Sequence, residues 1–241
     1  MGTESGGNAL EHATFAHALD SLKQDGSNIL LVGDSSSVAH RSGCERLLGE
    51  EGDQSRYRLF VVTEESCCSR GWAATHEDET DRYQYHEQGS KPDDADPTTK
   101  VIRRIADDTD ETTTPSVDES VVGTEMLNIL GTEVIDTINE FDDAANGLGP
   151  SELRLCVDSL VPLLTDHSSE NVFRLLHVLT LRVKQSSGMG HYHLPIDADH
   201  DAVNLLEPLF DAVVEVRNDD GVIEQRWTLR DQRTTSEWLP L

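Results

Sequence analysis

Short, mainly apolar segments that alternate with stretches of helical spacing are the feature that most constrains the fold of this chain. Three such segments stand out, at Asn28–Val32, Tyr57–Thr63 and Glu152–Asp158. A strand reads as a nearly continuous apolar run when both of its faces are covered, as in the parallel sheets of α/β proteins. The sequence therefore predicts a mostly parallel central sheet with helices on both faces, a three-layer α/β/α fold.

The segments between these strands predict helices. The clearest helix is expected over Glu170–Gln185, where apolar residues recur every three or four positions. The residues that form this stripe are Val172, Leu175, Leu176, Leu179 and Val183. Further helices are predicted over residues 8–24, 38–48 and 126–141. Two β-rich runs joined around Asp219–Gly221 predict an antiparallel C-terminal hairpin at one edge of the sheet.

The chain shows no internal repeat and no boundary between domains, so we expect residues 1–241 to form a single domain. One stretch within it, residues 106–120, contains six acidic residues, no basic residue and almost no core-forming side chain. Such a segment buries too little apolar surface to offset the entropy lost on ordering. We expect it to be an acidic, disordered loop.

The charge balance is strongly acidic along the whole chain. Formal net charge is −27, from 46 acidic and 19 basic residues. Like charges of this density repel one another in dilute buffer and are screened only at high ionic strength. The composition is typical of proteins from a halophilic cytoplasm. It also argues against nucleic acid as a partner, because Lys and Arg contacts to phosphate supply most of that affinity.

Neither a membrane nor an oxidising compartment is indicated. No apolar run approaches the roughly 20 residues that a membrane-spanning helix needs. The N-terminus lacks the basic and apolar regions of a signal peptide, so we expect a cytoplasmic protein with no membrane contact. Its cysteines are expected to be thiols rather than a disulfide framework. Cys67 and Cys68 are candidates for a redox sensor, but they lie beside two glutamates that would raise their thiol pKa values, so we favour inert thiols.

The segment that begins with the first predicted strand, "NILLVGDSSSVAHRSG", has the form of a phosphate-binding loop without its chemistry. A P-loop reads G-x-x-x-x-G-K-[ST], in which Lys neutralises phosphate and Ser/Thr binds Mg²⁺. Gly33 falls on the first glycine. The second glycine, the lysine and the hydroxyl residue are replaced by Val38, Ala39 and His40.

The order of elements resembles the RecA-like P-loop ATPase superfamily, in particular its KaiC/RadA-like branch and the short degenerate KaiC-like proteins of halophilic archaea. Three stretches carry the resemblance: "NILLVGDSSS", "LFVVTEES" and "LRLCVDSLVPLL". The resemblance implies that Gly33 and the serines Ser35, Ser36 and Ser37 are what is left of a phosphate loop. It also implies that Glu64 and Glu65 correspond to catalytic glutamates, and Asp158 to the acid that organises Mg²⁺.

Two classes of function follow from this resemblance. The hypothesis we favour is a non-catalytic, regulatory or signalling domain that binds another protein, uses no cofactor, and keeps Glu64, Glu65 and Asp158 as relics. The alternative is a nucleotide-binding sensor, or a weak ATPase, that uses ATP and Mg²⁺ through a rearranged loop. KaiC-like domains often form rings, so a homo-oligomer stays open under either hypothesis.

One further pair of residues could carry chemistry. His191 and His193 lie two positions apart, so on a strand both imidazoles face the same side. They are candidate ligands for Zn²⁺ or Cu²⁺, and Cys156 would join them if its strand were adjacent. A tetrahedral site needs further ligands. We therefore expect no metal site, and two histidines hydrogen-bonded to neighbouring loops.

Overall fold

The protein is described from a computed structural model, and the description is of residues 17–33, 37–49, 56–63, 98–103, 119–231 and 234–241. Within these residues one sheet of nine strands forms the centre of the fold, in the order β3-β2-β4-β5-β1-β6-β7-β8, with β9 paired to β7. The strands are β1 (Ser27–Gly33), β2 (Tyr57–Val62), β3 (Thr99–Arg103), β4 (Leu153–Val157), β5 (Met189–Leu194), β6 (Ala212–Asp219), β7 (Val222–Leu229), β8 (Thr234–Thr235) and β9 (Leu239–Pro240).

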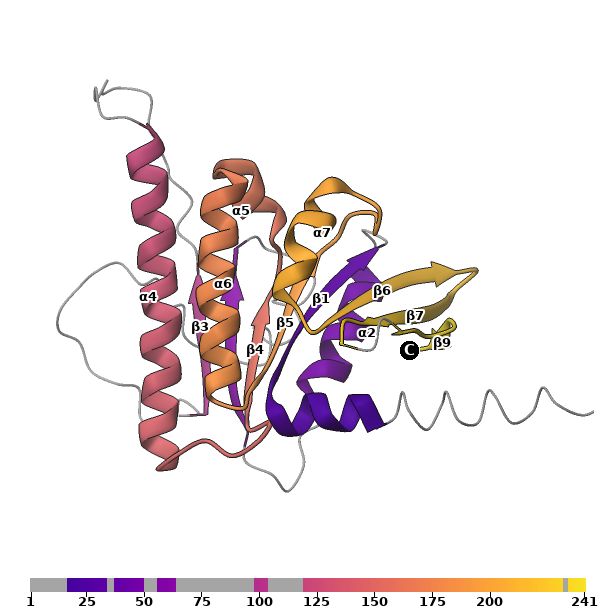
Figure 1. Ribbon diagram of the computed structural model, residues 1–241, viewed down its shortest axis with the longest axis horizontal. Helices are drawn as coiled ribbons and strands as arrows, with labels where there is room; N and C mark the ends of the chain where they lie inside the picture. The colour runs from indigo at the N-terminus through magenta and orange to yellow at the C-terminus, as the bar shows by residue number, and fades with distance from the viewer. Residues whose placement is uncertain (1–16, 34–36, 50–55, 64–97, 104–118, 232–233) are drawn as a thin grey trace, which may run out of the picture.

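Helices cover both faces of this sheet (Figure 1). They comprise residues 17–25, α2 (Ser37–Leu48), α4 (Glu119–Ala145), α5 (Val161–Asp166), α6 (Ser169–Gln185) and α7 (Asp201–Leu206), followed by the short η1 (Glu207–Leu209). In the view of Figure 1, α4 and α6 lie in front of the sheet and α2 lies behind it. Within the sheet, the neighbouring strands β3, β2, β4, β5, β1 and β6 are all parallel to one another, whereas β6 and β7 are antiparallel.

The predicted fold class is confirmed. The sheet is mostly parallel, helices flank it on both sides, and the antiparallel hairpin extends its C-terminal edge. The hairpin turns at Asp220 and Gly221, which both have positive φ angles, of 48° and 90°. This is the backbone that a two-residue type I′ turn requires.

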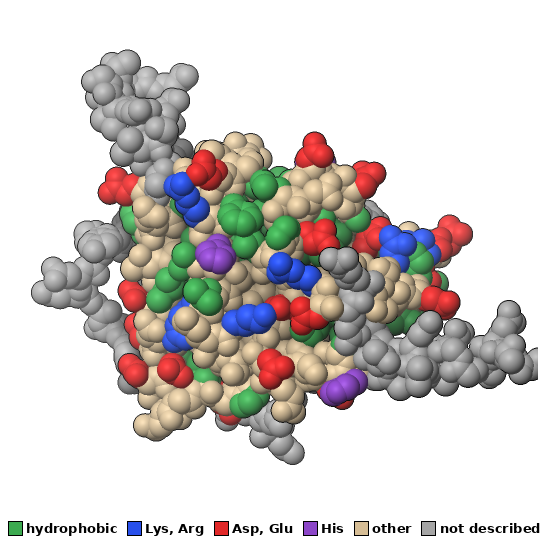
Figure 2. All heavy atoms as spheres, viewed as in Figure 1, with side chains coloured by type: hydrophobic (Ala, Val, Ile, Leu, Met, Phe, Trp, Pro, Cys, Tyr) green, Lys and Arg blue, Asp and Glu red, His purple; other side chains and the backbone are tan. Residues whose placement is uncertain are grey.

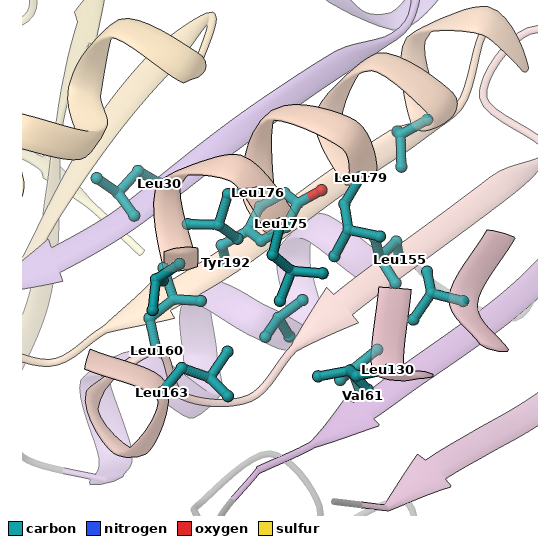
Figure 3. Close-up of a cluster of buried hydrophobic side chains, with 14 of the residues drawn as sticks. Leu30, Val61, Leu130, Leu155, Leu160, Leu163, Leu175, Leu176, Leu179 and Tyr192 are labelled. Carbon is teal, nitrogen blue, oxygen red and sulfur yellow. The ribbon is translucent and has the colours of Figure 1, made fainter. Parts of the chain in front are cut away.

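The larger apolar core lies between the sheet and the helices α4 to α7. Figure 3 shows α6 placing Leu175, Leu176 and Leu179 against strand residues that include Leu155 and Tyr192. All of these side chains are buried. The predicted stripe of α6 is therefore its core-facing side, and Ser168 caps the helix by accepting a hydrogen bond from the backbone N–H of Asn171.

Some predicted boundaries were wrong. The helix expected over residues 126–141 is longer at both ends, because α4 begins at Glu119 and ends at Ala145. The predicted acidic loop, 106–120, lies outside the described residues as far as 118, and its last two residues belong to α4. Among the described residues, no helix is long and apolar enough to cross a membrane.

Candidate functional site

Gly33, the remnant of the phosphate loop, is held by its close approach to β6. Its φ angle is +109°, and a Cβ atom at this position would lie only 2.3 Å from the carbonyl oxygen of Val216. Its backbone N–H donates to the carbonyl of Ile196, at 2.8 Å. Packing alone therefore accounts for the glycine. Of the predicted loop serines, Ser37 is the first residue of α2, whereas Ser35 and Ser36 lie outside the described residues.

The positions that should carry the lysine and hydroxyl of a P-loop are packed into the protein. Ala39, at the lysine position, has 0% exposure and packs in an apolar cluster with Ile29 and Leu31 of β1. His40, at the hydroxyl position, is 2% exposed, whereas Val38 is 55% exposed. The first turn of α2 thus lies against the sheet with these two side chains inward. A lysine at residue 39 would have its ammonium buried in the core.

Asp158, the predicted magnesium-organising acid, is engaged in structural hydrogen bonds. One carboxylate oxygen accepts from both the backbone N–H and the hydroxyl of Thr63, at 2.8 and 2.9 Å. Its own N–H donates to Val61, at 3.0 Å. These bonds join the ends of β2 and β4. The other acids that the resemblance singled out, Glu64 and Glu65, lie outside the described residues.

The most unusual side-chain arrangement lies on the opposite face of the sheet from the larger helices, under α2. Cys156 of β4 is the register partner of His191 of β5, and His193 projects from the same face two residues further on. Cys44 of α2 lies above them. The ligating atoms of these four residues all lie within 4.8 Å of one another, and the four side chains are buried. We call this group the thiol–imidazole cluster.

The contacts within the thiol–imidazole cluster are close. Cys44 Sγ lies 3.3 Å from His191 Nε2 and 3.6 Å from Cys156 Sγ. No disulfide joins the two cysteines. His40, also on α2, has its Nδ1 3.0 Å from Nδ1 of His193. Four groups that can ligate a soft or borderline metal ion therefore converge in the interior.

Part of this cluster is predictable from the sequence. His191 and His193 are the predicted pair, and Cys156 joins them because β4 and β5 are adjacent strands. Cys44 and His40 are not connected to them by any sequence pattern described above. One signal was present: His40 and Cys44 are four residues apart in a predicted helix, so they share one face. Which strands that face covers depends on the sheet order, and the sequence does not contain this directly.

Arginines bind the other end of α2. Arg154 donates to the carbonyl of Leu47, at 3.0 Å, and Arg56 to that of Leu48, at 3.5 Å. Burial is the main cause that lowers the pKa of Arg154 to about 10, and the nearby charges of Arg56 and Arg58 add to it. The guanidinium therefore stays charged at neutral pH. Cations at the last carbonyls of a helix stabilise it. Both ends of α2 are thus anchored to the sheet by polar side chains.

The fold and the site together define a class: a mostly parallel α/β domain in which a buried thiol–imidazole cluster lies beneath the helix that follows the first strand. Residues 26–216 match the model of the family of unknown function DUF7504, and the chain belongs to this family. No curated protein matches the chain. Among solved structures, it is similar to a KaiC-like protein of the hyperthermophilic archaeon Pyrococcus horikoshii OT3. The two are 11% identical with a TM-score of 0.49, over 90% of this chain and 85% of that one.

Proposed function

We propose that this chain is a non-catalytic RecA/KaiC-like domain that regulates by binding another protein and needs no nucleotide. The observation that carries the proposal is the burial of Ala39 in the core at the position of the P-loop lysine. Phosphoryl transfer depends on positioned cations and hydroxyls around the phosphates. The side chains of Ala39 and His40 supply neither, and Asp158 is engaged with Thr63.

The surface that we assign to the partner is a groove between β3 and α4. Its cavity has a volume of about 310 Å³, with Ile102, Leu127 and Leu130 among its lining residues. Three apolar side chains around it are partly exposed: Val101 (36%), Met126 (37%) and Ile129 (49%). Apolar patches rimmed by polar residues mark interaction sites more often than scattered apolar residues do. We call these residues the β3–α4 groove.

The charge around the β3–α4 groove selects the kind of partner. Glu133, Asp136 and Glu140 also line it, and Lys100, at its edge, is paired with Glu140. Acidic side chains are spread over the face seen in Figure 2 as well. A second copy of this chain would bring acid against acid. We therefore assign the groove to an apolar segment of a different protein, flanked by Lys or Arg, in a salt-rich cytoplasm.

The non-catalytic part of the proposal is tested by ATP turnover and binding. Purified protein in high KCl with Mg²⁺ should hydrolyse ATP no faster than buffer and should show no heat of ATP binding by calorimetry. Turnover that disappears in Glu64→Gln would contradict the proposal and favour a weak ATPase. Binding without turnover would favour a nucleotide sensor.

The binding part is tested by site-specific photocrosslinking in the source cells. A photoreactive amino acid placed at Ile129 should give a crosslink to one other protein, and the crosslinked peptide should be apolar with basic flanks. The matched control is Leu181, an aliphatic residue of α6 that is 51% exposed. A crosslink to a second copy of this chain, equal yields from both positions, or no crosslink would each contradict the assignment.

A further inference from the structure

We propose that the thiol–imidazole cluster is a zinc site in which Cys44, Cys156, His191 and His193 are the four ligands. The inference goes beyond the regulatory function proposed above and does not depend on it. It rests on where the fold places these four side chains. They come from three elements, α2, β4 and β5, and from sequence positions as far apart as 44 and 193.

The distances suit a tetrahedral zinc ion. With Zn–S near 2.3 Å and Zn–N near 2.0–2.1 Å, the ligand atoms of a tetrahedron are separated by about 3.3–3.8 Å. Cys44 Sγ is 3.6 Å from Cys156 Sγ and 3.3 Å from His191 Nε2. All four ligating atoms lie within 4.8 Å of one another. Small side-chain rotations would therefore be enough to close the shell around one ion.

The ligand types select the metal. Two thiolates and two imidazoles form the Cys₂His₂ set typical of structural zinc sites, whereas Mg²⁺ and Ca²⁺ prefer oxygen ligands. All four side chains are between 0% and 2% exposed. A closed, buried, four-coordinate site has no open position for water or substrate. We infer a structural role for the ion rather than a catalytic one.

His40 is suited to orient one of the ligands. A metal-ligating histidine usually makes a hydrogen bond through its second ring nitrogen, which fixes the ring and its tautomer. Nδ1 of His193 lies 3.0 Å from Nδ1 of His40, so this contact uses one nitrogen of His193 and leaves the other for the ion. His40 is thus a positioning residue and not a ligand.

The position of the site indicates what zinc would do. Cys44 lies on α2, whereas Cys156 and His191 belong to strands in the middle of the sheet. An ion bound by all of them would tie α2 to the sheet. Since ligand binding to the folded state alone raises stability by mass action, the packing of α2 would depend on the metal.

The first experiment uses the unmodified chain. The protein is unfolded with guanidinium, EDTA and a thiol reductant, then refolded in high KCl with or without Zn²⁺, and its zinc content and melting temperature are measured. We expect about one zinc ion per chain, as one tetrahedral site requires, and a higher melting temperature with Zn²⁺ but not with Mg²⁺. A refolded protein that retains no zinc, or whose melting temperature Zn²⁺ does not change, overturns the proposal.

The second experiment locates the ion. Co²⁺ in place of zinc should give intense tetrahedral d–d absorption and a thiolate-to-cobalt charge-transfer band. The variants Cys44→Ser and Cys156→Ser should each weaken the charge-transfer band, because each removes one thiolate. Cys67→Ser is the matched control, and it should keep the full spectrum because four ligands already fill the shell. Loss of the band in this control, or no change in the first two, would overturn the ligand assignment.

A third measurement tests whether His40 orients the ligand His193 or only contributes to the packing of the fold. His40→Gln retains hydrogen-bonding groups, whereas His40→Leu removes them. Loss of an outer-shell partner costs about 10–100-fold in metal affinity. In competition with a chromophoric chelator, His40→Leu should lose that factor while the cobalt spectrum keeps its shape, and His40→Gln should recover part of it. Equal affinity in all three proteins, or a changed spectrum in His40→Leu, would overturn the assignment of His40.

Discussion

At the scale of single residues, the glycine at position 33 is explained by packing against β6 and not by phosphate binding. Its positive φ angle and the Val216 carbonyl beside it leave no room for a side chain. We expect Gly33→Ala to destabilise the protein, first through backbone strain of about 1–2 kcal/mol and then through a clash of about 1–3 kcal/mol. Unfolding by urea measures the sum.

Gly147 provides the matched control, because it has a similar φ angle of +103° but open space: apart from Gly147 and its two chain neighbours, no atom lies within 4 Å of the point that an added Cβ would occupy. Gly147→Ala should show the strain alone, so it should be the milder change. Equal losses of stability in the two variants would contradict the close contact with β6.

A second prediction at this scale concerns Asp158. Its carboxylate accepts two hydrogen bonds from Thr63, and bonds to a charged group contribute about 1.5–3 kcal/mol. Asp158→Ala should therefore lower the free energy of unfolding by about that amount, and Asp158→Asn, which retains one acceptor oxygen, by less. In a double-mutant cycle with Thr63→Val the two losses should not add. Additive losses would show that the pair is not coupled.

At the scale of elements, α2 offers a direct test of whether the phosphate loop can be restored. Ala39→Lys puts the P-loop lysine back, but into a fully buried position. Overpacking and an unpaired buried charge should cost about 3 kcal/mol or more. We expect a loss of stability and no gain of ATP binding, measured by thermal unfolding and calorimetry.

The neighbouring residue controls for the added charge. Val38 is 55% exposed, so Val38→Lys should change the free energy of unfolding by no more than about 0.5 kcal/mol. If Ala39→Lys were as well tolerated as Val38→Lys, or if it bound ATP, the first turn of α2 would not be packed as described.

The elements also show what the sequence could and could not predict. The stripe of α6 and the hairpin at Asp220 and Gly221 were predictable, because each follows from local periodicity or turn chemistry. The placement of Cys44 above Cys156 was not, because it depends on β4 and β5 being neighbours while α2 crosses them. Such contacts are set by sheet order, which local pattern does not contain.

At the scale of the whole molecule, the net charge of −27 should make stability depend on salt. The Debye length falls from about 30 Å at 0.01 M salt to about 3 Å at 1 M. Repulsion across the surface should weaken accordingly, so we expect the melting temperature to rise between dilute buffer and molar KCl. A melting temperature that KCl leaves unchanged would contradict this account.

The central position of β1 also affects how the chain folds during synthesis. Ile29 pairs with His191 on one side and with Ala212 on the other, so β1, the earliest strand among the described residues, has both neighbours only after β6 has been made. Ribosomes add about 5–20 residues per second, so β1 lacks its full pair of neighbouring strands for roughly 10–40 s. During this time an apolar strand and the thiol of Cys44 have no finished sheet to enter. We expect folding to be slow and to depend on protection of the nascent chain.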